Sequence, residues 1–254
     1  MLDEREERSL EAQVDALRTK EKDSESRKTY DQVFDHPALM CLAKLISAGV
    51  LSTLDYPVST GKEASVFHGT DPKGSAVAVK IYRVNNATFR NIARYIEGDP
   101  RFKGVKRGTK PTVLAWARKE HKNLLRMAEA GVRVPRPRAL EQNILVMDYI
   151  GDEERPAPLI RNVDLDDPDA VYRDVVANMR GIRNAALVHA DLSEYNMLFW
   201  QDAVVIIDVG QAVPLEHHRA AEWFRRDLEN VARYFRRLGV ETSADALEGA
   251  VTGA

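Results

Sequence analysis

The stretch L-V-H-A-D-L-S-E-Y-N, residues Leu187–Asn196, is followed after a short strand-like run by V-V-I-I-D-V-G, residues Val204–Gly210. These two segments decide the fold. A loop holding Asp191 and Asn196, followed by a buried apolar strand that ends at Asp208, gathers two carboxylates and one amide. Phosphoryl transfer needs such groups, because the protein orients the attacking oxygen and supplies hard oxygen ligands for Mg²⁺. Asp191 suits the first task, and Asn196 and Asp208 suit the second.

The composition is that of a globular chain without a dominant charge. Its 254 residues can bury a good core and fit one bilobal domain or two small ones. A net charge of -2 gives no overall field for nucleic-acid binding, although local basic clusters remain open. The single cysteine, Cys41, excludes an intramolecular disulfide and a cysteine-based metal site. No apolar run has the length of a membrane span, so we expect a soluble, cytoplasmic protein with no membrane partner.

Changes of periodicity along the chain predict three parts. Residues 1–49 form an N-terminal helical extension, of which the highly charged residues 1–30 form a frayed helix or, alternatively, an arm that docks a partner. Residues 50–147 carry short β-rich pieces and a flexible insertion at about 84–111. Residues 148–254 are mainly helical. The expected fold is α+β and bilobal, with a nucleotide in the crevice near Asp148.

Helical spacing and end signals predict the individual helices. One begins at His36 and ends before Gly49, with Leu39, Leu42, Ala43 and Ile46 on its apolar face. The others are expected over Thr112–Ala130, from Asp167-Pro168 toward Ala186, over Glu216–Gly239 and from Ser243 onward, with Trp223, Leu228, Val231 and Phe235 as core candidates.

A lysine stands out in the predicted strand S-A-V-A-V-K-I-Y, residues Ser75–Tyr82. Alternation places Lys80 on the face opposite Val77, Val79 and Ile81 and beside small residues, where it can reach into a cleft. The alternative is a strand lysine that extends to solvent.

The order of these motifs resembles the protein-kinase fold: a loop of small residues, a strand lysine, a helix glutamate, H-A-D with an asparagine, and I-D-V-G. The chain is most similar to the RIO family of atypical serine/threonine kinases, in the subfamily with the phosphate loop S-T-G-K-E-A, and in particular to its short archaeal form. That string occupies Ser59–Ala64 here. The other matching strings are V-A-V-K-I-Y-R at Val77–Arg83, W-A-R-K-E at Trp116–Glu120, H-A-D-L-S-E-Y-N at His189–Asn196 and I-D-V-G-Q-A-V at Ile207–Val213.

The resemblance implies a bilobal kinase with a small β-rich N-lobe and a reduced helical C-lobe that binds ATP with Mg²⁺, or with Mn²⁺ in its place. Lys80 contacts the α- and β-phosphates and pairs with Glu120, although Glu120 could instead be a surface partner on a charged helix. Around the phosphates the resemblance places Ser59, Gly61, Lys62 and Ser65. Val66 and Ala78 pack on the adenine ring, while the backbones of Asp148 and Ile150 hydrogen-bond its edge. Met147 is a gate residue or a core residue; both readings stay open.

In the same resemblance Asp191 is the general base or orienting group, and Asn196 and Asp208 ligate the metal. Asp208 is also implied as a phosphate acceptor that forms an aspartyl-phosphate, because a carboxylate can act as a nucleophile. His189 more often braces backbone than takes part in the chemistry. After Gly210 the chain runs through Pro214 into a helix, with no A-P-E and no room for an activation loop. Binding of a protein substrate in the usual kinase groove is therefore doubtful.

The resemblance implies a role in late maturation of the small ribosomal subunit, with rRNA and proteins of its precursor as partners and with serine autophosphorylation. Thr109 and Thr112 are candidate acceptors. The basic stretch from Arg101 to Lys110 meets rRNA phosphates or is simply solvated. Two other functions compete: a small-molecule kinase of the aminoglycoside or choline type, and a nucleotide-sensing scaffold that binds pre-ribosomes with negligible turnover. The oligomeric state is not readable.

Overall fold

The computed structural model describes residues 36–84, 92, 95–96, 99–102, 104–106, 108–152 and 155–253. The predictions for residues 1–30 and for much of the insertion at 84–111 therefore lie outside the described residues. The chain divides into two compact units. The first is drawn from Met1–Asn91, Lys106–Arg118 and Pro137–Tyr149, and the second from Ile92–Val105, Lys119–Arg136 and Ile150–Ala254. Our domain boundaries, 1–49, 50–147 and 148–254, stay a prediction.

A five-stranded antiparallel sheet forms the first unit, with strand order β1-β2-β3-β5-β4. The strands are β1 (Thr53–Thr60), β2 (Ala64–Thr70), β3 (Ala76–Tyr82), β4 (Pro137–Glu141) and β5 (Ile144–Asp148). Sequence reasoning missed β4, because P-R-A-L-E lacks the β-branched and aromatic residues that mark a strand.

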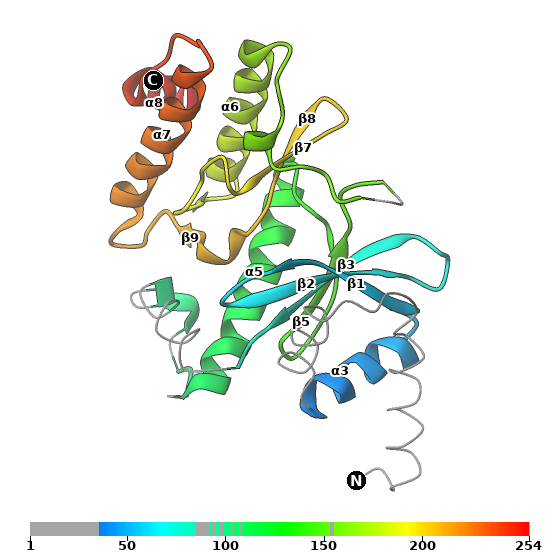
Figure 1. The fold of residues 1–254 in the computed structure, drawn as a ribbon. Coiled ribbons are helices and arrows are strands. Elements are labelled where there is room, and N and C mark those ends of the chain that lie inside the picture. Colours follow the sequence, from blue (N-terminus) through cyan, green and yellow to red (C-terminus); the bar gives the residue numbers. More distant parts are fainter. Residues whose placement is uncertain are drawn as a thin grey trace, which may run out of the picture. The chain divides into compact units, whose positions relative to one another are not determined.

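Helix α3 (His36–Ser47) lies beside one face of this sheet, as Figure 1 shows. Its buried residues Cys41, Leu42 and Leu45 pack with the sheet residues Phe67 and Val79. Of the predicted apolar face, Leu42 and Ala43 are buried and Ile46 packs against the same core, whereas Leu39 is half-buried. The predicted face is thus largely confirmed, and Ala38, Cys41 and Leu45 are buried as well.

Helix α5 (Thr109–Glu129) contributes its first half to the first unit and its second half to the second. It begins three residues earlier than predicted. Pro111 does not prevent this, because a proline in the first turn removes a backbone donor that has no intrahelical partner. Gly131, at a φ of 80°, follows its end, as the sequence indicates.

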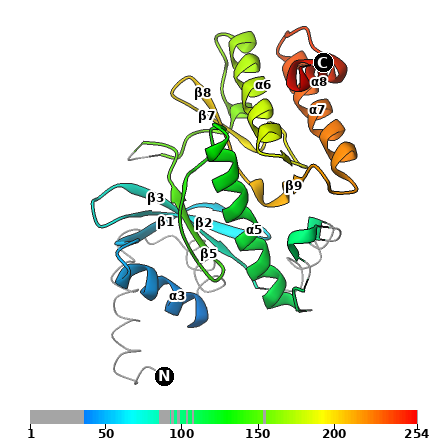
Figure 2. The ribbon, with the colours of Figure 1, turned by 180° about the vertical axis from the view of Figure 1, so that it is seen from behind.

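In the described part of the second unit, the second half of α5 is joined by three further helices and by short strands. Helix α6 (Pro168–Asn184) starts where predicted, because Asp167 accepts a hydrogen bond from the Ala170 backbone at 2.8 Å and Pro168 opens the helix. Figure 2 shows α6, α7 (Ala220–Arg237) and α8 (Ala244–Thr252) side by side. The short elements are β6 (Leu187–Val188), β7 (Met197–Trp200), β8 (Ala203–Ile206), β9 (Val213–Pro214) and the 3-10 turns η1 (Pro100–Phe102), η2 (Ile160–Asn162) and η3 (Val209–Gln211).

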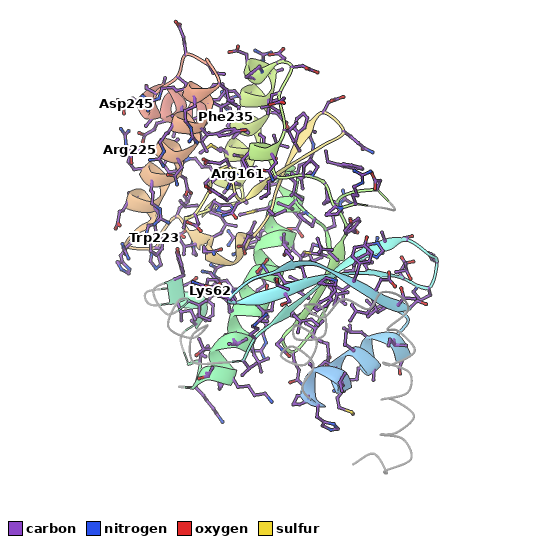
Figure 3. All side chains as sticks on the ribbon, in the orientation of Figure 1. Lys62, Arg161, Trp223, Arg225, Phe235 and Asp245 are labelled. Atoms are coloured by element: carbon purple, nitrogen blue, oxygen red, sulfur yellow. The ribbon has the colours of Figure 1, made fainter. Side chains whose placement is uncertain are left out.

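Helix α7 begins four residues later than predicted, but its predicted core residues Trp223, Leu228, Val231 and Phe235 are all buried. Figure 3 shows Trp223 and Phe235 on this helix, and Arg225 near Asp245 of α8. Arg225 Nη1 lies 2.5 Å from Asp245 Oδ1 at the surface. Across the described ranges no helix combines the length and the apolar composition that a membrane crossing requires.

Candidate active site

The second unit brings together Asp191, Asn196 and Asp208, the three polar residues singled out from the sequence. Strands β7 and β8 form a hairpin, and the chain that leaves β8 returns beside Asn196, because the Ile207 backbone N–H donates to the Asn196 carbonyl at 3.0 Å. The Asn196 side chain in turn donates from Nδ2 to the Asp191 carbonyl at 2.8 Å. Asp208 follows Ile207 directly, so Asp191, Asn196 and Asp208 belong to one backbone arrangement.

The donor set of this arrangement fits Mg²⁺. Because the nitrogen end of the Asn196 amide donates to Asp191, its oxygen end is the one that can ligate a cation. The Asp208 carboxylate does not cap the turn η3 that it precedes. Mg²⁺ is usually held by one or two carboxylates together with substrate phosphates and water, which one carboxylate and one amide oxygen can complement.

His189 acts as a brace. Its Nε2 lies 3.3 Å from the Ile207 carbonyl, which can only accept, so Nε2 carries the proton. Burial lowers the pKa of His189 to about 4, although the nearby Asp208 carboxylate raises it. The imidazole is therefore neutral at pH 7 and holds the backbone next to Asp208. This confirms the bracing role expected from the sequence.

Side chains of helix α7 form hydrogen bonds with the backbone of the loop around Asp191. Asp227 accepts hydrogen bonds from the backbone N–H groups of Ala190 and Leu192, both at 2.8 Å. Arg226 donates to the Ala190 carbonyl, and Asn230 donates to the Leu192 carbonyl at 3.2 Å. These bonds stabilise a strained backbone, because Ala190 has a φ of 68°, a left-handed conformation that costs an alanine roughly 1–2 kcal/mol.

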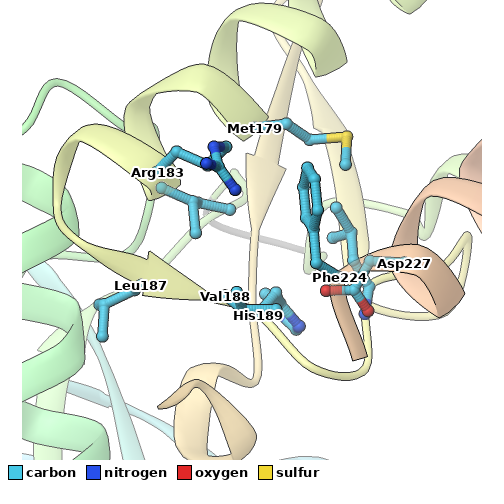
Figure 4. A pocket seen from close by; sticks show the side chains of 9 residues that line it. Met179, Arg183, Leu187, Val188, His189, Phe224 and Asp227 are labelled. Carbon is cyan, nitrogen blue, oxygen red and sulfur yellow. The ribbon is translucent and has the colours of Figure 1, made fainter. Parts of the chain in front are cut away.

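Asp227 is almost fully buried and lines a small pocket with His189, shown in Figure 4. Burial raises the pKa of Asp227 to about 8, against the lowering influence of its two backbone N–H donors. Sequence reasoning missed this residue. The sequence did indicate it, because Asp227 falls at helical spacing between Trp223 and Val231 on the apolar face of α7. A carboxylate is buried at such a position only when hydrogen bonds compensate the loss of water.

In the first unit, Lys80 lies on the predicted face of β3. It is directly opposite Val66 of β2 and Leu145 of β5, and Ala78 is opposite Met147. Lys80, Val66, Ala78 and Met147 therefore share one face of the sheet, opposite the face that packs on α3. The Lys80 Nζ lies 5.3 Å from the centre of the Tyr82 ring, a cation–π contact.

Ser59, next to the last residue of β1, and Gly61 and Lys62, in the loop between β1 and β2, are exposed. Gly61 closes the loop, donating to the Ala64 carbonyl at 2.9 Å; a Cβ added there would lie only 3.2 Å from that oxygen. Ser65 differs from these residues. It is fully buried and accepts a hydrogen bond from Arg83 Nη2 at 3.2 Å.

Ser65 is paired with Ile81 across the sheet, which puts it on the α3 face and separates it from Lys80. The alternation along β2, which places Val66 with Lys80, turns its neighbour Ser65 away. The Ser65 side chain therefore lies on the other face of the sheet from Lys80, so any phosphate contact of Ser65 would have to come from its backbone; that contact stays a prediction.

The remaining predicted residues lie on different elements. Asp148 ends β5, and its carboxylate accepts from Arg138 Nε at 2.7 Å, so the nucleotide contact expected of it is through its backbone. The Ile150 carbonyl accepts from Ala157 at 2.9 Å. Glu120 is buried on α5 at 1% exposure, which argues against a surface partner role. Its pairing with Lys80 stays a prediction.

A family model for the RIO domain matches residues 65–247. The chain is 42% identical to the RIO-type serine/threonine-protein kinase Rio1 of Haloferax volcanii, over 97% of this chain and 85% of that protein. It is 39% identical to the human serine/threonine-protein kinase RIO1, over 92% of this chain but only 42% of the human protein. The chain belongs to the RIO kinase family.

A solved RIO structure has the same fold. It is the Rio2 kinase–ADP/Mg²⁺–phosphoaspartate complex from Chaetomium thermophilum, which matches with a TM-score of 0.65 at 24% identity and covers 85% of this chain and 65% of that one. The α+β kinase fold expected from the motifs is confirmed. In this RIO kinase the elements that carry S-T-G-K-E-A, H-A-D and I-D-V-G are therefore the hairpin β1–β2, the loop after β6 and the end of β8.

The basic stretch of this RIO kinase differs from the expectation. Arg101 is not a free cation, because its guanidinium binds Asp99 from Nε at 2.9 Å and from Nη2 at 2.7 Å. Lys103 and Arg107 lie outside the described residues, while Lys106 and Lys110 are exposed. Of the two candidate acceptors, Thr112 is buried at 7% exposure, whereas Thr109 is half-exposed. Burial argues against Thr112 as an acceptor.

Lys119 is a buried cation of this RIO kinase that no motif indicated, although it stands next to Glu120 in W-A-R-K-E. Its Nζ lies 3.8 Å from the Asp99 carboxylate. Burial, together with the nearby positive charge of Arg101, lowers the pKa of Lys119 from 10.5 to about 7, while Asp99 and Glu120 raise it.

The Lys119 pKa predicts a pH dependence of stability. Between pH 7 and 10.5 the unfolded chain holds a proton on Lys119 that the folded chain has lost, so stability rises with pH in this window. The free energy of unfolding of the wild type, minus that of Lys119→Met, should increase on the order of 2 kcal/mol from pH 7 to pH 9. Urea unfolding at both pH values measures it. A difference that does not change with pH would mean that Lys119 keeps its ordinary pKa.

Proposed function

We propose that this chain binds ATP with Mg²⁺ and transfers the γ-phosphoryl group, as a RIO-type kinase with ATPase activity. The observation that carries the proposal is the hydrogen-bonded arrangement of Asp191, Asn196 and Asp208 within the second unit. In this proposal Asp191 orients the attacking oxygen and accepts its proton. Asn196 Oδ1 and the Asp208 carboxylate hold Mg²⁺, which neutralises charge on the phosphates.

The first unit is proposed to hold the nucleotide. Lys80 contacts the α- and β-phosphates and is kept in place by Glu120, while Ser59, Gly61 and Lys62 surround the phosphates. Val66, Ala78 and Met147 pack against adenine, and the backbones of Asp148 and Ile150 hydrogen-bond its edge. Support comes from the sheet register, which puts Val66, Ala78, Met147 and Lys80 on one face. Met147 has its side chain on that face and is also buried, so both a gate residue and a core residue fit its position.

An aspartyl-phosphate on Asp208 is part of the proposal. The Asp208 carboxylate oxygen attacks the γ-phosphorus, the bond to the β–γ bridging oxygen breaks, and ADP leaves; water then hydrolyses the acyl phosphate. Support comes from the phosphoaspartate in the Chaetomium thermophilum Rio2 complex, which has the same fold. Autophosphorylation on a hydroxyl is the alternative fate of the phosphoryl group, with Asp191 accepting the proton.

The biological setting we propose is late maturation of the small ribosomal subunit in the cytoplasm, with the subunit precursor as partner. It is supported by the RIO family resemblance. Mn²⁺ can be expected to replace Mg²⁺ in the assay, because both take oxygen ligands.

The test is ATP hydrolysis by the purified chain with and without small-subunit precursors. We expect precursor-stimulated turnover that Asp191→Ala abolishes while nucleotide binding persists. Tight nucleotide binding with negligible turnover under both conditions would contradict the enzyme and favour the nucleotide-sensing scaffold. Stimulation by a small alcohol or aminoglycoside, rather than by the precursor, would favour a small-molecule kinase.

A further inference from the structure

Three buried side chains, Asp99, Lys119 and Asn123, and the half-buried Arg101 form a cluster of hydrogen bonds and ion pairs in the second unit, which we call the buried polar cluster. Asp99 and Arg101 come from the segment around η1, and Lys119 and Asn123 lie on α5. Arg101 joins the two elements, because it binds Asp99 and also donates from Nη1 to Asn123 Oδ1 at 2.7 Å. That bond determines the orientation of the Asn123 amide, whose Nδ2 must point the other way.

The remaining N–H donors of this cluster bind the backbone of the turn that follows Asp208. Asn123 Nδ2 donates to the Val209 carbonyl at 2.7 Å and to the Ala212 carbonyl at 3.1 Å. Arg101 Nη2 also donates to the Ala212 carbonyl at 3.1 Å, and Lys119 Nζ donates to the Gln211 carbonyl at 3.3 Å. Three carbonyls of this short turn are therefore held by side chains from outside it.

These carbonyls control the geometry of Asp208. The orientation of each carbonyl is set by the backbone dihedrals on either side of it, so fixing three of them fixes the path of residues 209–212. Asp208 enters this turn with a φ of 58° and a ψ of 57°, a left-handed conformation that a non-glycine residue adopts only where its surroundings impose it. Without external donors, the turn could relax and swing the Asp208 carboxylate away.

The charges of the cluster agree with this task. The fully buried carboxylate of Asp99 pairs with the Arg101 guanidinium, so the charges of these two residues balance. Lys119 can donate to the Gln211 carbonyl in either protonation state, because the ammonium and the neutral amine both carry N–H donors. Breaking these bonds would leave buried polar groups without partners, which is costly, so the bonds resist breaking.

We propose that Arg101, Lys119 and Asn123 are positioning residues that hold Asp208 in the geometry required to ligate the metal, and that docking of the segment around Asp99 and Arg101 is thereby coupled to metal binding. The inference rests on the proposed function, since it takes Asp208 as a metal ligand. Groups that orient a metal ligand typically change metal affinity by 10- to 100-fold when they are removed.

The test measures metal affinity directly. Mn²⁺ binding to the full chain with saturating ADP is followed by electron paramagnetic resonance for the wild type, Asn123→Asp and Lys119→Met. Asn123→Asp keeps an acceptor for Arg101 but loses the donor to Val209 and Ala212. We expect both variants to bind Mn²⁺ at least about tenfold more weakly, with unchanged affinity for ADP in the absence of metal.

Lys122→Met is the matched control, because Lys122 is exposed on the same helix; it should bind Mn²⁺ as the wild type does. Melting temperatures without metal separate positioning from a general loss of structure, which would lower ADP and Mn²⁺ binding together. Folded variants with wild-type Mn²⁺ affinity would overturn the inference. A wild type that binds no Mn²⁺ with ADP would instead overturn the proposed function.

The wild type alone gives a second measurement, which does not depend on whether a variant folds. If docking and metal binding are coupled, the coupling is reciprocal. Adding Mn²⁺ and ADP should slow hydrogen exchange of the Arg101 and Phe102 amides, which donate to Asp99, as well as of the Ala212 amide. Slowing at Ala212 with no change at residues 101–102 would contradict the coupling.

Discussion

Asp208→Asn is expected to reduce the rate of phosphoryl transfer by roughly 10³-fold, a loss typical of removing one electrostatic contact to the transition state. The substitution keeps the size of the side chain but replaces a carboxylate by an amide, which is a weaker ligand for Mg²⁺ and cannot form an acyl phosphate. Steady-state ATP hydrolysis and transfer of radiolabelled γ-phosphate to the protein measure the two effects. The label should be acid-labile and hydroxylamine-sensitive in the wild type and absent in Asp208→Asn.

Asp202→Asn is the control for this prediction. Asp202 is an exposed aspartate in the turn between β7 and β8, so the same change there should leave both measurements unaffected. Hydroxylamine-sensitive label that persists in Asp208→Asn would show that another residue accepts the phosphate. Turnover within a few fold of the wild type would show that Asp208 is not needed for the chemistry.

Asp227→Ala is expected to have the second-largest effect, although Asp227 is not proposed to touch ATP. The variant leaves the buried N–H groups of Ala190 and Leu192 without their acceptor, which should lower the free energy of unfolding by roughly 2–5 kcal/mol. It also frees Ala190 from its left-handed conformation and so displaces Asp191. A displacement on the order of 1 Å can lower turnover about 10²-fold.

Asp227→Asn tests the same bonds with a smaller change, because the amide keeps one accepting oxygen but presents a donor to the other N–H. We expect the free energy of unfolding to fall less in Asp227→Asn than in Asp227→Ala. Asp245→Asn is the control, since Asp245 pairs with Arg225 at the surface and such pairs contribute roughly 0–1 kcal/mol. Urea unfolding and ATP turnover are measured on all three. Wild-type stability and turnover in Asp227→Ala would mean that the hydrogen bonds from Asp227 to the loop of Asp191 are dispensable.

The sequence predicted the elements whose pattern is local. The strand of Lys80, the start of α6 at Asp167-Pro168 and the buried face of α7 each follow from alternation, a capping residue or helical spacing within a few neighbours. Strand β4 was missed, because P-R-A-L-E becomes a strand only through its pairing with β5. The apolar face of α3 was predicted except for Leu39, which is half-buried, while the burial of Cys41 and Leu45 follows from their packing against the sheet.

In the candidate site, too, some features were predicted from the sequence and others came only from the tertiary structure. Residue type and spacing alone predicted that Asp191, Asn196 and Asp208 act together in phosphoryl transfer, because that chemistry demands particular oxygen donors in a particular order. Only the tertiary structure decided that Ser65 faces away from Lys80, that Asp227 holds the loop of Asp191, and that Lys119 and Asn123 hold the turn after Asp208. The physical reason is that the hydrogen bonds of Asp227, Lys119 and Asn123 join backbone groups to side chains from 35 to 92 residues away in the chain. A backbone carbonyl or N–H is the same in every residue, so the sequence carries no mark of which one a distant side chain will bind.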